Sequence, residues 1–320
     1  MATQTQATVL GESILDIVIR DGQQDERVGG SPLNVAVGLA RLGNDVTFVT
    51  QLGDDRAGAL VACHLEAAHV RIAEGSIARK ATSVARATID ERGDATYDFS
   101  FEWDSASVVL SPSLSGLLHL GAVASSSAAD SQLMARLAVV RPRTVISFDP
   151  NIRPALTGEG PEAAASVERI VSLCDLVKVS TEDIRLLYGA VEPASVATAW
   201  LLRGPGLVVI TDGANGVQAF TPSAEMCVDA SRVERLADTI GAGDAFMSGL
   251  LWALDSFGAL RRETLAQIQA DILARCLRIA ATSAALAVEQ RGANPPTLHA
   301  LTERLRRDDA VEHARRHFSR

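Results

Sequence analysis

Short apolar runs rich in β-branched residues alternate along this chain with longer segments of helical period that are rich in alanine and leucine. A continuous apolar run is typical of a strand buried on both faces, and strands separated by helices pair in parallel. The alternation therefore predicts an α/β fold with a mainly parallel central sheet between two layers of helices. We expect strands at residues 7–10, 46–51, 117–120, 144–149, 176–179 and 207–211, and helices at 31–42, 58–68, 128–140, 163–173, 182–188 and 244–252.

Length and charge limit the classes of protein that this chain can represent. It has 320 residues, of which 47% are hydrophobic, and a formal net charge of −9 at pH 7. One large domain or two ordinary ones would fit this length, and because no proline- or glycine-rich linker divides the chain we expect one domain over residues 1–320. The acidic balance argues against a nucleic-acid partner, since phosphate backbones are bound by clustered basic residues.

Cysteines, histidines and apolar runs give no sign of a zinc site, export or membrane insertion. The four cysteines lie far apart, and the histidines form no HExxH pair. Residues 1–8 are polar, and no uncharged apolar run approaches the roughly 18 residues of a membrane-spanning helix. We therefore expect a cytoplasmic protein with no membrane partner.

Two stretches break the alternation of strands and helices. Residues 14–28 and 81–103 read as β-strands, the second as a pair of strands around a turn at 90–94. Consecutive parallel crossovers do not need such hairpins, so we expect a small β-rich lid that closes on a ligand and excludes water. Outer apolar positions of the lid would need cover, and we expect a homodimer formed through it. Residues 304–320 are charged and predict a solvated helix.

The segment from Asp238 to Phe246 reads Asp-Thr-Ile-Gly-Ala-Gly-Asp-Ala-Phe and leads from a small-residue turn directly into a helix. Gly241 and Gly243 permit close approach to the backbone, so free N–H groups of the first helical turn can bind one anion, aided by the helix dipole. Asp244 has two interpretations there. It caps the helix, or it accepts the proton of a hydroxyl group that attacks a phosphorus atom held by those amides. The second interpretation predicts phosphoryl transfer.

A second motif, Gly-Gly-Ser-Pro-Leu-Asn-Val-Ala, begins at Gly29 and opens the helix expected at 31–42. Glycines and a proline at this place are ordinary helix-start signals. Asn34 lies one turn into an otherwise apolar helix, where its amide can donate to and accept from polyol hydroxyl groups. Asp16 lies within the apolar run 14–19, and a buried carboxylate needs partners. Sugar hydroxyl groups would satisfy it, and so would nearby backbone amides.

The two motifs together resemble the signatures of the ribokinase or PfkB-type carbohydrate kinases. That family has a Gly-Gly-x-Pro-x-Asn-x-Ala stretch, here within 29–53, and an Asp-Thr-x-Gly-Ala-Gly-Asp-x-Phe stretch, here 238–246, in this order and about 200 residues apart. The resemblance extends over about residues 9–296 and includes 148–153, 178–189 and 211–216. It implies a ribokinase-like three-layer fold with a small β-rich lid.

The same resemblance implies roles for individual residues. Asp244 is similar to the family's catalytic base, and the backbone amides of Gly241, Ala242 and Gly243 are similar to its anion hole. The implied sugar-binding residues are Asp16, Gly29, Gly30 and Asn34. The implied nucleotide-binding residues are Lys178, Thr211, Gly213 and Gly216. A monovalent-cation site would be formed by Asp238, the carbonyl group of Ile240 and the loop 290–294 around Gly292.

The chain departs from the family at one motif. An Asn-x-x-Glu sequence that the family ties to magnesium and phosphate is replaced here by Ser180 and Asp183. The shorter acid keeps the charge, so we interpret Asp183 as a magnesium-linked residue whose contact is weakened or mediated by water. Arg153 forms either a surface ion pair or a contact to substrate or phosphate.

The activity that the resemblance implies is phosphorylation of a terminal hydroxymethyl group of a small sugar, with ATP, Mg²⁺ and, as a monovalent cation, K⁺. Residues 149–153 and 97–103 look most like those of fructokinases, so fructose is the expected substrate. A 2-keto-3-deoxygluconate kinase, a ribokinase and a non-catalytic sugar-responsive binding protein on the same fold remain alternatives. A Rossmann dehydrogenase and a P-loop enzyme are disfavoured, because neither GxGxxG after the first strand nor GxxxxGK[ST] occurs.

Overall fold

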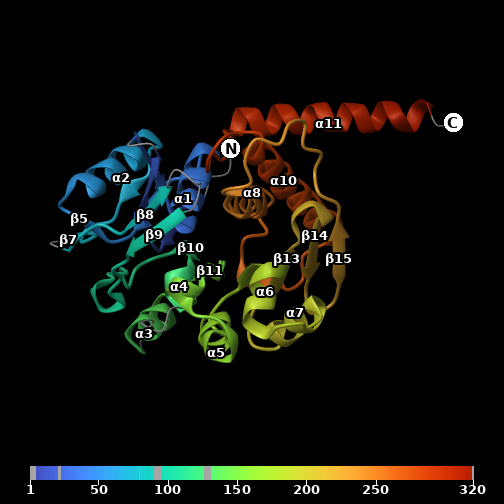
Figure 1. Cartoon of the computed structure of the whole chain (residues 1–320). Helices are drawn as coiled ribbons and strands as arrows, with labels where there is room; N and C mark the ends of the chain where they lie inside the picture. The colour runs from blue at the N-terminus through green and yellow to red at the C-terminus, as the bar shows by residue number, and fades with distance from the viewer. Residues whose placement is uncertain (1–4, 21–22, 79, 90–94, 126–130, 319–320) are drawn as a thin grey trace.

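One large sheet separates two layers of helices (Figure 1). A computed structural model describes residues 5–20, 23–78, 80–89, 95–125 and 131–318, and within these ranges the sheet has nine strands. From one edge to the other they are β15 (Glu225–Val228), β14 (Val217–Phe220), β13 (Leu207–Thr211), β12 (Leu176–Ser180), β11 (Thr144–Phe148), β10 (Gly116–Leu120), β1 (Ala7–Leu10), β4 (Val46–Val49) and β6 (Arg71–Ile72). Pairing is parallel from β6 to β13 and antiparallel for β14 and β15.

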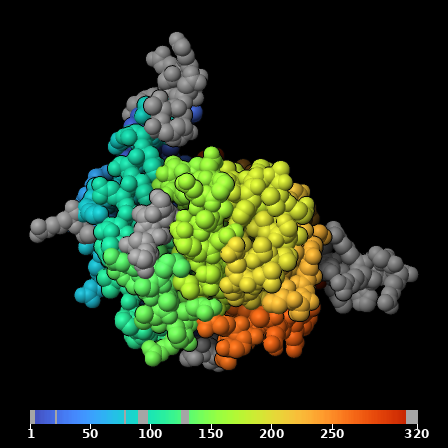
Figure 2. All heavy atoms as spheres, turned by 90° about the horizontal axis from the view of Figure 1, so that it is seen from below, coloured from blue at the N-terminus to red at the C-terminus, as the bar shows by residue number. Residues whose placement is uncertain are grey.

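Helices cover both faces of this sheet, as the sequence predicts. One layer consists of α1 (Ser31–Arg41), α2 (Arg56–Ala67), α8 (Ala242–Ser256) and α10 (Ala270–Val288). The other consists of α3 (Ser131–Val140), α5 (Gly160–Val171), α6 (Thr181–Tyr188) and α7 (Pro193–Leu201), whose green and yellow atoms form one continuous face in Figure 2. Each layer buries its own apolar cluster against the sheet, so the three-layer α/β fold expected from the sequence is confirmed.

Short elements connect these layers. The helices outside them are α4 (Pro154–Thr157), α9 (Arg262–Leu265) and α11 (Leu298–Phe318), and the 3₁₀ turns are η1 (Ser105–Ser107), η2 (Ala122–Ser125), η3 (Arg141–Arg143) and η4 (Gly213–Asn215). Strands β5 (Leu52–Gly53) and β7 (Ile77–Ala78) form a small parallel pair beside α2.

A second sheet forms where the sequence predicts the lid. Its strands, in spatial order, are β3 (Gln23–Gly29), β2 (Ile14–Arg20), β8 (Val84–Ile89) and β9 (Ala95–Ser100). Strands β2 and β3 come from the stretch 14–28, and β8 and β9 come from 81–103, so the expected strands are found. The turn expected at 90–94 lies outside the described residues.

All six strands and six helices predicted for the α/β core are present, with small shifts of their ends. The sequence analysis missed α7, α10, β14 and β15. Helix α10 exposes the polar residues Asp271, Arg275 and Arg278 along one side of its first half, whereas its second half, from Ala280 to Val288, is nearly all small or apolar. The expectation of a fully solvated helix at 304–320 is wrong at its start, because α11 begins at Leu298 and buries Arg304 at 3% exposure.

The described residues contain neither a disulfide nor a helix suited to a bilayer. All four cysteines have free thiol groups. No helix in the described ranges combines the length and the hydropathy needed to span a membrane.

Helices α1 and α8 pack directly against each other, and this contact brings their N-terminal ends together. Gly38 of α1 faces α8: a Cβ atom at this position would lie 2.7 Å from the Cβ of Ser248 and 3.3 Å from the Cβ of Pro295. Interiors are packed as densely as organic crystals, so a larger residue at position 38 must push the two helices apart.

We therefore expect Gly38→Ala to lower the free energy of unfolding by about 1–3 kcal/mol through overpacking. The double variant Gly38→Ala/Ser248→Gly should recover part of this loss, because it removes the side chain that the new methyl group meets. Urea unfolding of the four proteins of this mutant cycle measures the coupling. Additive effects of the two substitutions would show that the α1–α8 contact is looser than described.

Candidate active site

The N-terminal ends of α1 and α8 form the centre of the site, and a glycine with positive φ precedes each helix. Gly30 has φ 116° and Gly241 has φ 77°, conformations that other residues adopt only with strain. A Cβ atom on Gly30 would lie 2.6 Å from the carbonyl oxygen of Glu12, and one on Gly241 would lie 2.8 Å from the Cβ of Ala293. The glycines of both sequence motifs are therefore required by backbone conformation and by close packing.

Asp244 lies in the first turn of α8 and is held by α1. One carboxylate oxygen accepts a hydrogen bond from Ser31 Oγ at 2.6 Å, and the other accepts one from Asn34 Nδ2 at 2.8 Å. Burial raises the pKa of Asp244, the two hydrogen bonds oppose this, and the negative charge of Asp149 adds to the increase. A desolvated carboxylate in a fixed orientation is suited to accept a proton. Sequence reasoning gave Ser31 no role, although it lies between the motif glycines and the motif proline.

The backbone N–H groups at the start of α8 lie close to Asp244 in the same helical turn. They have no acceptors within the helix, because the first four N–H groups of any helix lack them. The amide of Ala242, one of the three expected in the anion hole, donates to the carbonyl oxygen of Thr239 at 3.3 Å. Among the described residues, no acceptor is found for the amides of Gly241 and Gly243. Of the three amides expected in the anion hole, these two remain available to an anion.

Lys178 on β12 lies beside this helix start. Its ammonium group binds the carboxylate of Asp149 at 2.9 Å, and both side chains are buried. Burial lowers the pKa of Lys178, but the charges of Asp149, Asp183 and Asp244 outweigh this and raise it. A Cβ atom on Gly243 would lie 3.1 Å from Nζ, so the ammonium group adjoins the free amide of Gly243. The structure thus places Lys178 beside the start of α8, and Lys178 is not among the residues that line the pocket beside Thr211.

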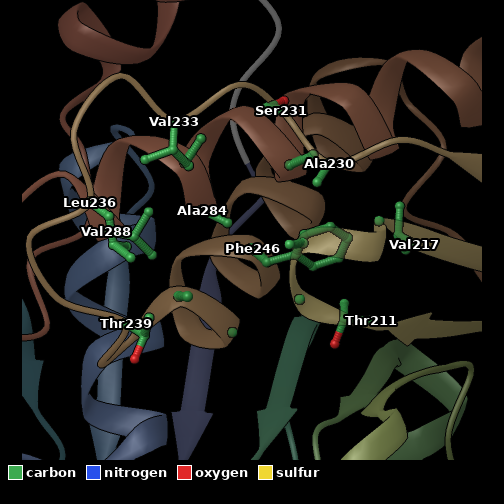
Figure 3. Close-up of a pocket in the computed structure, with 17 residues that line it drawn as sticks. Thr211, Val217, Ala230, Ser231, Val233, Leu236, Thr239, Phe246, Ala284 and Val288 are labelled. Atoms are coloured by element: carbon green, nitrogen blue, oxygen red, sulfur yellow. The ribbon is translucent and has the colours of Figure 1, made fainter.

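That pocket is a cavity of about 720 Å³ on the other side of the α8 start (Figure 3). Thr211, Gly213 and Gly216 line it, as expected for the nucleotide-binding residues, together with Gly243. Its remaining walls are mostly apolar and come from β14, the segment 230–239, α8 and α10. Sequence reasoning missed the parts of these walls that come from α10 and β14, because it had not identified these two elements.

The residues expected to bind the acceptor lie on the side of α1. Asp16 is exposed on β2, although it lies in an apolar run, since alternate residues of this strand face opposite sides of the small sheet. Partial desolvation raises the pKa of its carboxyl group, and Arg27 on β3 opposes this. A Cβ atom on Gly29 would lie 2.6 Å from Asp16 Oδ2, so Gly29 leaves room beside the carboxylate. The structure therefore brings Asp16, Gly29, Gly30 and Asn34 together.

Glu12 was not identified from the sequence, although an acidic residue two positions after a buried strand is a recognisable signal. Its side chain is buried beneath the Gly29–Gly30 turn, and burial raises its pKa to about 7. Asp244 raises this pKa further and Arg153 lowers it. Arg153 itself is exposed and donates to the carbonyl oxygen of Ile152 at 2.9 Å; no ion pair is found for it within the described ranges.

Asp183 has a structural role that the sequence did not reveal. It forms a capping box with Ser180 at the start of α6, accepting hydrogen bonds from the amide and the hydroxyl group of Ser180, and its other oxygen accepts from the amide of Ile152 at 2.8 Å. Both oxygens are therefore in use. No group of three or more His, Cys, Asp or Glu side chains suited to a metal ion occurs in the part of the chain that the structure describes.

The loops expected to bind a monovalent cation lie together. Asp238 accepts hydrogen bonds from the amides of Ile240 at 3.1 Å and Gly292 at 2.9 Å, and these donors lower the pKa of its carboxyl group. Asp238 thus ties the loop before α8 to the loop after α10. No hydrogen bond to the carbonyl group of Ile240 is found among the described residues.

Known proteins resemble this chain over nearly its whole length. The family described as pfkB family carbohydrate kinase matches residues 5–300. Fructokinase from Rhizobium leguminosarum bv. trifolii is 31% identical over 278 residues, which cover 82% of this chain and 84% of that protein. The structure of fructokinase from Xylella fastidiosa with bound ATP has a TM-score of 0.79 at 25% identity and covers 95% of this chain and 99% of that one. A fructokinase double mutant from Vibrio cholerae O395 with fructose, ADP and potassium ion bound has a TM-score of 0.79 at 26% identity, with the same coverage.

We expect Asp244→Asn to stabilise the folded protein by about 0.5–2 kcal/mol at neutral pH, as removal of an active-site charge often does. Because the folded state raises the pKa of Asp244, ionisation of this residue costs stability as the pH rises from the unfolded pKa through the folded one. The stability difference between variant and wild type should therefore grow over that interval and level off above it. Urea unfolding at several pH values measures it, and a constant difference would contradict the desolvation of Asp244.

Proposed function

Because the chain belongs to the pfkB family of carbohydrate kinases, we propose that it transfers the γ-phosphoryl group of ATP to a terminal hydroxymethyl group of a small sugar, with fructose as its preferred acceptor. The observation that supports this most directly is the position of Asp244. Its buried carboxylate lies between the free amides of Gly241 and Gly243 and the polar side chains of α1. A base, an anion hole and an acceptor site therefore meet at one helix start.

In the proposed reaction, the hydroxymethyl oxygen forms a bond to the γ-phosphorus while the bond from phosphorus to the bridging oxygen breaks and ADP leaves. The hydroxyl proton moves to the carboxylate of Asp244. The amides of Gly241 and Gly243 and the ammonium group of Lys178 stabilise the charge on the transferred group, and they do so at no cost of rearrangement because the fold already holds them in place.

The cavity beside Thr211 takes the nucleotide. Its apolar walls suit a base and its glycines allow phosphates close to the backbone, while Gly243 connects it to the anion hole. Bound Mg²⁺ would neutralise phosphate charge. Asp149 fits a role in holding that ion or its waters, since its second carboxylate oxygen is buried with no hydrogen-bond partner among the described residues. Asp183 contributes charge near Lys178 while its own oxygens are engaged.

Acceptor binding is assigned to Asp16, Gly29, Gly30 and Asn34, and Arg153 lies near enough to influence Glu12 electrostatically. A polyol face matches the carboxylate and amide groups of this set. Fructose is favoured because the similar proteins named above are fructokinases, one of them with fructose bound. The joined loops at Asp238, Ile240 and Gly292 are proposed to hold K⁺, the ion present in the same relative.

We propose a homodimer that pairs through the lid, and a reducing cytoplasm as the protein's location. Strand β9 is an edge of the small sheet, and Phe99 on it is 41% exposed and stacked on Phe101 with ring centroids 5.8 Å apart. Phe101 follows the strand and is partly buried, and an exposed aromatic side chain such as Phe99 on an edge strand is a surface that proteins usually cover. The free thiol groups of all four cysteines, two of them exposed, are consistent with a reducing compartment.

Fructose should give the highest kcat/KM, by about tenfold or more, in an ADP-release assay with fructose, ribose, 2-keto-3-deoxygluconate, tagatose 6-phosphate and adenosine. Asp244→Asn should lower kcat by about a hundredfold or more, because it removes the proton acceptor. The assay includes Mg²⁺ and compares K⁺ with Na⁺. Absence of Asp244-dependent ADP release with every acceptor would overturn the kinase proposal and favour the sugar-responsive binding protein.

Sedimentation at micromolar concentration should show a dimer of the wild type and a monomer of Phe99→Glu, because the new charge would be desolvated in the interface. Leu202→Glu is the matched control: Leu202 is 87% exposed after α7, far from the lid, and its substitution should leave the dimer intact. A monomeric wild type would disprove the dimer and leave the kinase proposal unaffected.

A further inference from the structure

An exposed loop forms one wall of the nucleotide pocket and has no secondary structure of its own. Residues 230–236 run from β15 towards α8, and four of them line the cavity: Ala230, Ser231, Val233 and Leu236. Figure 3 shows Val233 and Leu236 at one end of the pocket, near Val288 of α10. Val233 and Leu236 are 38% and 65% exposed. A segment with so few apolar contacts of its own is mobile unless other groups hold its backbone.

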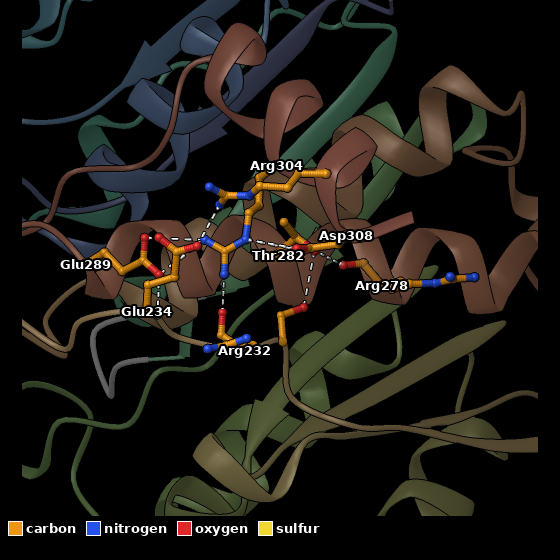
Figure 4. A network of polar contacts seen from close by, with 9 residues as sticks. Arg232, Glu234, Arg278, Thr282, Glu289, Arg304 and Asp308 are labelled. Carbon is orange, nitrogen blue, oxygen red and sulfur yellow. Dashed lines mark hydrogen bonds and ion pairs between the residues drawn. The ribbon is translucent and has the colours of Figure 1, made fainter. Parts of the chain in front are cut away.

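The C-terminal helix supplies the group that holds this loop. Arg304 of α11 is 3% exposed, and its guanidinium group donates to the backbone carbonyl oxygen of Arg232 (Figure 4). The same group binds both carboxylate oxygens of Glu289 at 3.2 and 3.4 Å and both of Asp308 at 3.3 Å. A planar guanidinium group can serve all three partners at once, whereas an ammonium group cannot.

Glu289 provides the second tie. It lies directly after α10, and its carboxylate, paired with Arg304, accepts a hydrogen bond from the backbone amide of Glu234 at 2.7 Å. Arg307 of α11 also binds the side chain of Glu234 at 2.9 Å, and Ser231 Oγ lies 3.2 Å from Thr282 Oγ1 of α10. The backbone of the loop is therefore attached at two points to one buried ion pair.

A contribution to stability alone is a poor explanation for the presence of the Arg304–Glu289 ion pair. Buried ion pairs contribute little net stability, because desolvation offsets their attraction. Arg304, Arg307 and Asp308 also lie beyond residues 5–300, the part that matches the family. The pair connects α11 with the loop that lines the pocket, and the exposed ion pair between Arg307 and Glu234 connects the same two parts from outside.

We propose that Arg304 is a positioning residue for the nucleotide: through Arg232 and Glu289 it holds the loop 230–236 in the conformation that closes the apolar wall of the pocket. This inference rests on the proposed function, since it takes the cavity to be the nucleotide site. A loop ordered before binding does not lose conformational entropy when the nucleotide arrives, so affinity is higher. The C-terminal helix thereby sets the affinity for the nucleotide without touching it.

The test uses a variant that removes the ion pair without leaving a buried charge. Arg304→Met/Glu289→Met keeps similar side-chain volume, and replacements of this kind are often neutral or stabilising. Arg304→Lys is a second variant, which keeps the charge but cannot bind all three partners. Arg306→Ala is the matched control, because Arg306 is an exposed arginine on the same helix with no contact to the loop among the described residues.

We expect the double variant to raise the KM for ATP by about tenfold or more while the KM for the sugar and kcat stay within about twofold. Arg304→Lys should show an intermediate increase, and Arg306→Ala should equal the wild type. Calorimetric titration with ADP should give a matching loss of affinity. Equal increases in both KM values, or no change in either, would overturn the proposal.

Hydrogen exchange separates this inference from the proposed function. In protein without nucleotide, the amide of Glu234 and its neighbours should exchange faster in the double variant and in Arg304→Lys than in the wild type and Arg306→Ala. Unchanged exchange would show that Arg304 does not hold the loop. Failure of the wild type to bind ATP or to phosphorylate any sugar would overturn the proposed function, and the exchange result would still decide whether Arg304 holds the loop.

Discussion

The hydrogen bonds from Ser31 and Asn34 to Asp244 are the contact on which the site depends. They connect two helix starts that are 210 or more residues apart in sequence, and both carboxylate oxygens are used. Each helix begins at a glycine with positive φ, so the direction in which it leaves the sheet is fixed by backbone conformation. Close packing between Gly38 and Ser248 then sets the distance between the helices. Local backbone geometry and helix packing thus together determine the position and orientation of the Asp244 carboxylate.

The electrostatic environment at the start of α8 is a balance between buried positive and negative charges. Lys178 is the cation among three carboxylates, those of Asp149, Asp183 and Asp244, and it binds one of them directly. Burial is the main cause of the raised pKa of Asp244; the negative charge of Asp149 adds to the increase and the positive charge of Lys178 opposes it. A phosphoryl group needs positive charge nearby, so the site relies on backbone dipoles and on bound cations in addition to Lys178. This explains why the helix start, and not a cluster of basic side chains, forms the anion-binding part.

Prediction from the sequence succeeded where structure is determined locally and failed where it is determined by partners distant in sequence. The glycine motifs and the short apolar runs specify helix starts and strands by conformational preference alone, so they were recognised. The place of Lys178 beside the start of α8, the capping role of Asp183 and the burial of Arg304 each depend on residues from other elements.

The division of the site between two halves of the chain limits which parts can vary. All residues that line the nucleotide cavity lie between Thr211 and Val288, whereas those assigned to the acceptor, Arg153 apart, lie between Asp16 and Asn34. Changes in the small sheet can therefore alter the fit of an acceptor without disturbing the cavity. The position of Asp244 cannot vary in this way. Its carboxylate accepts a hydrogen bond from Asn34, which is assigned to the acceptor, and the preceding residue, Gly243, lines the cavity. A small displacement of the start of α8 would therefore change both proposed binding sites and the proposed proton acceptor together.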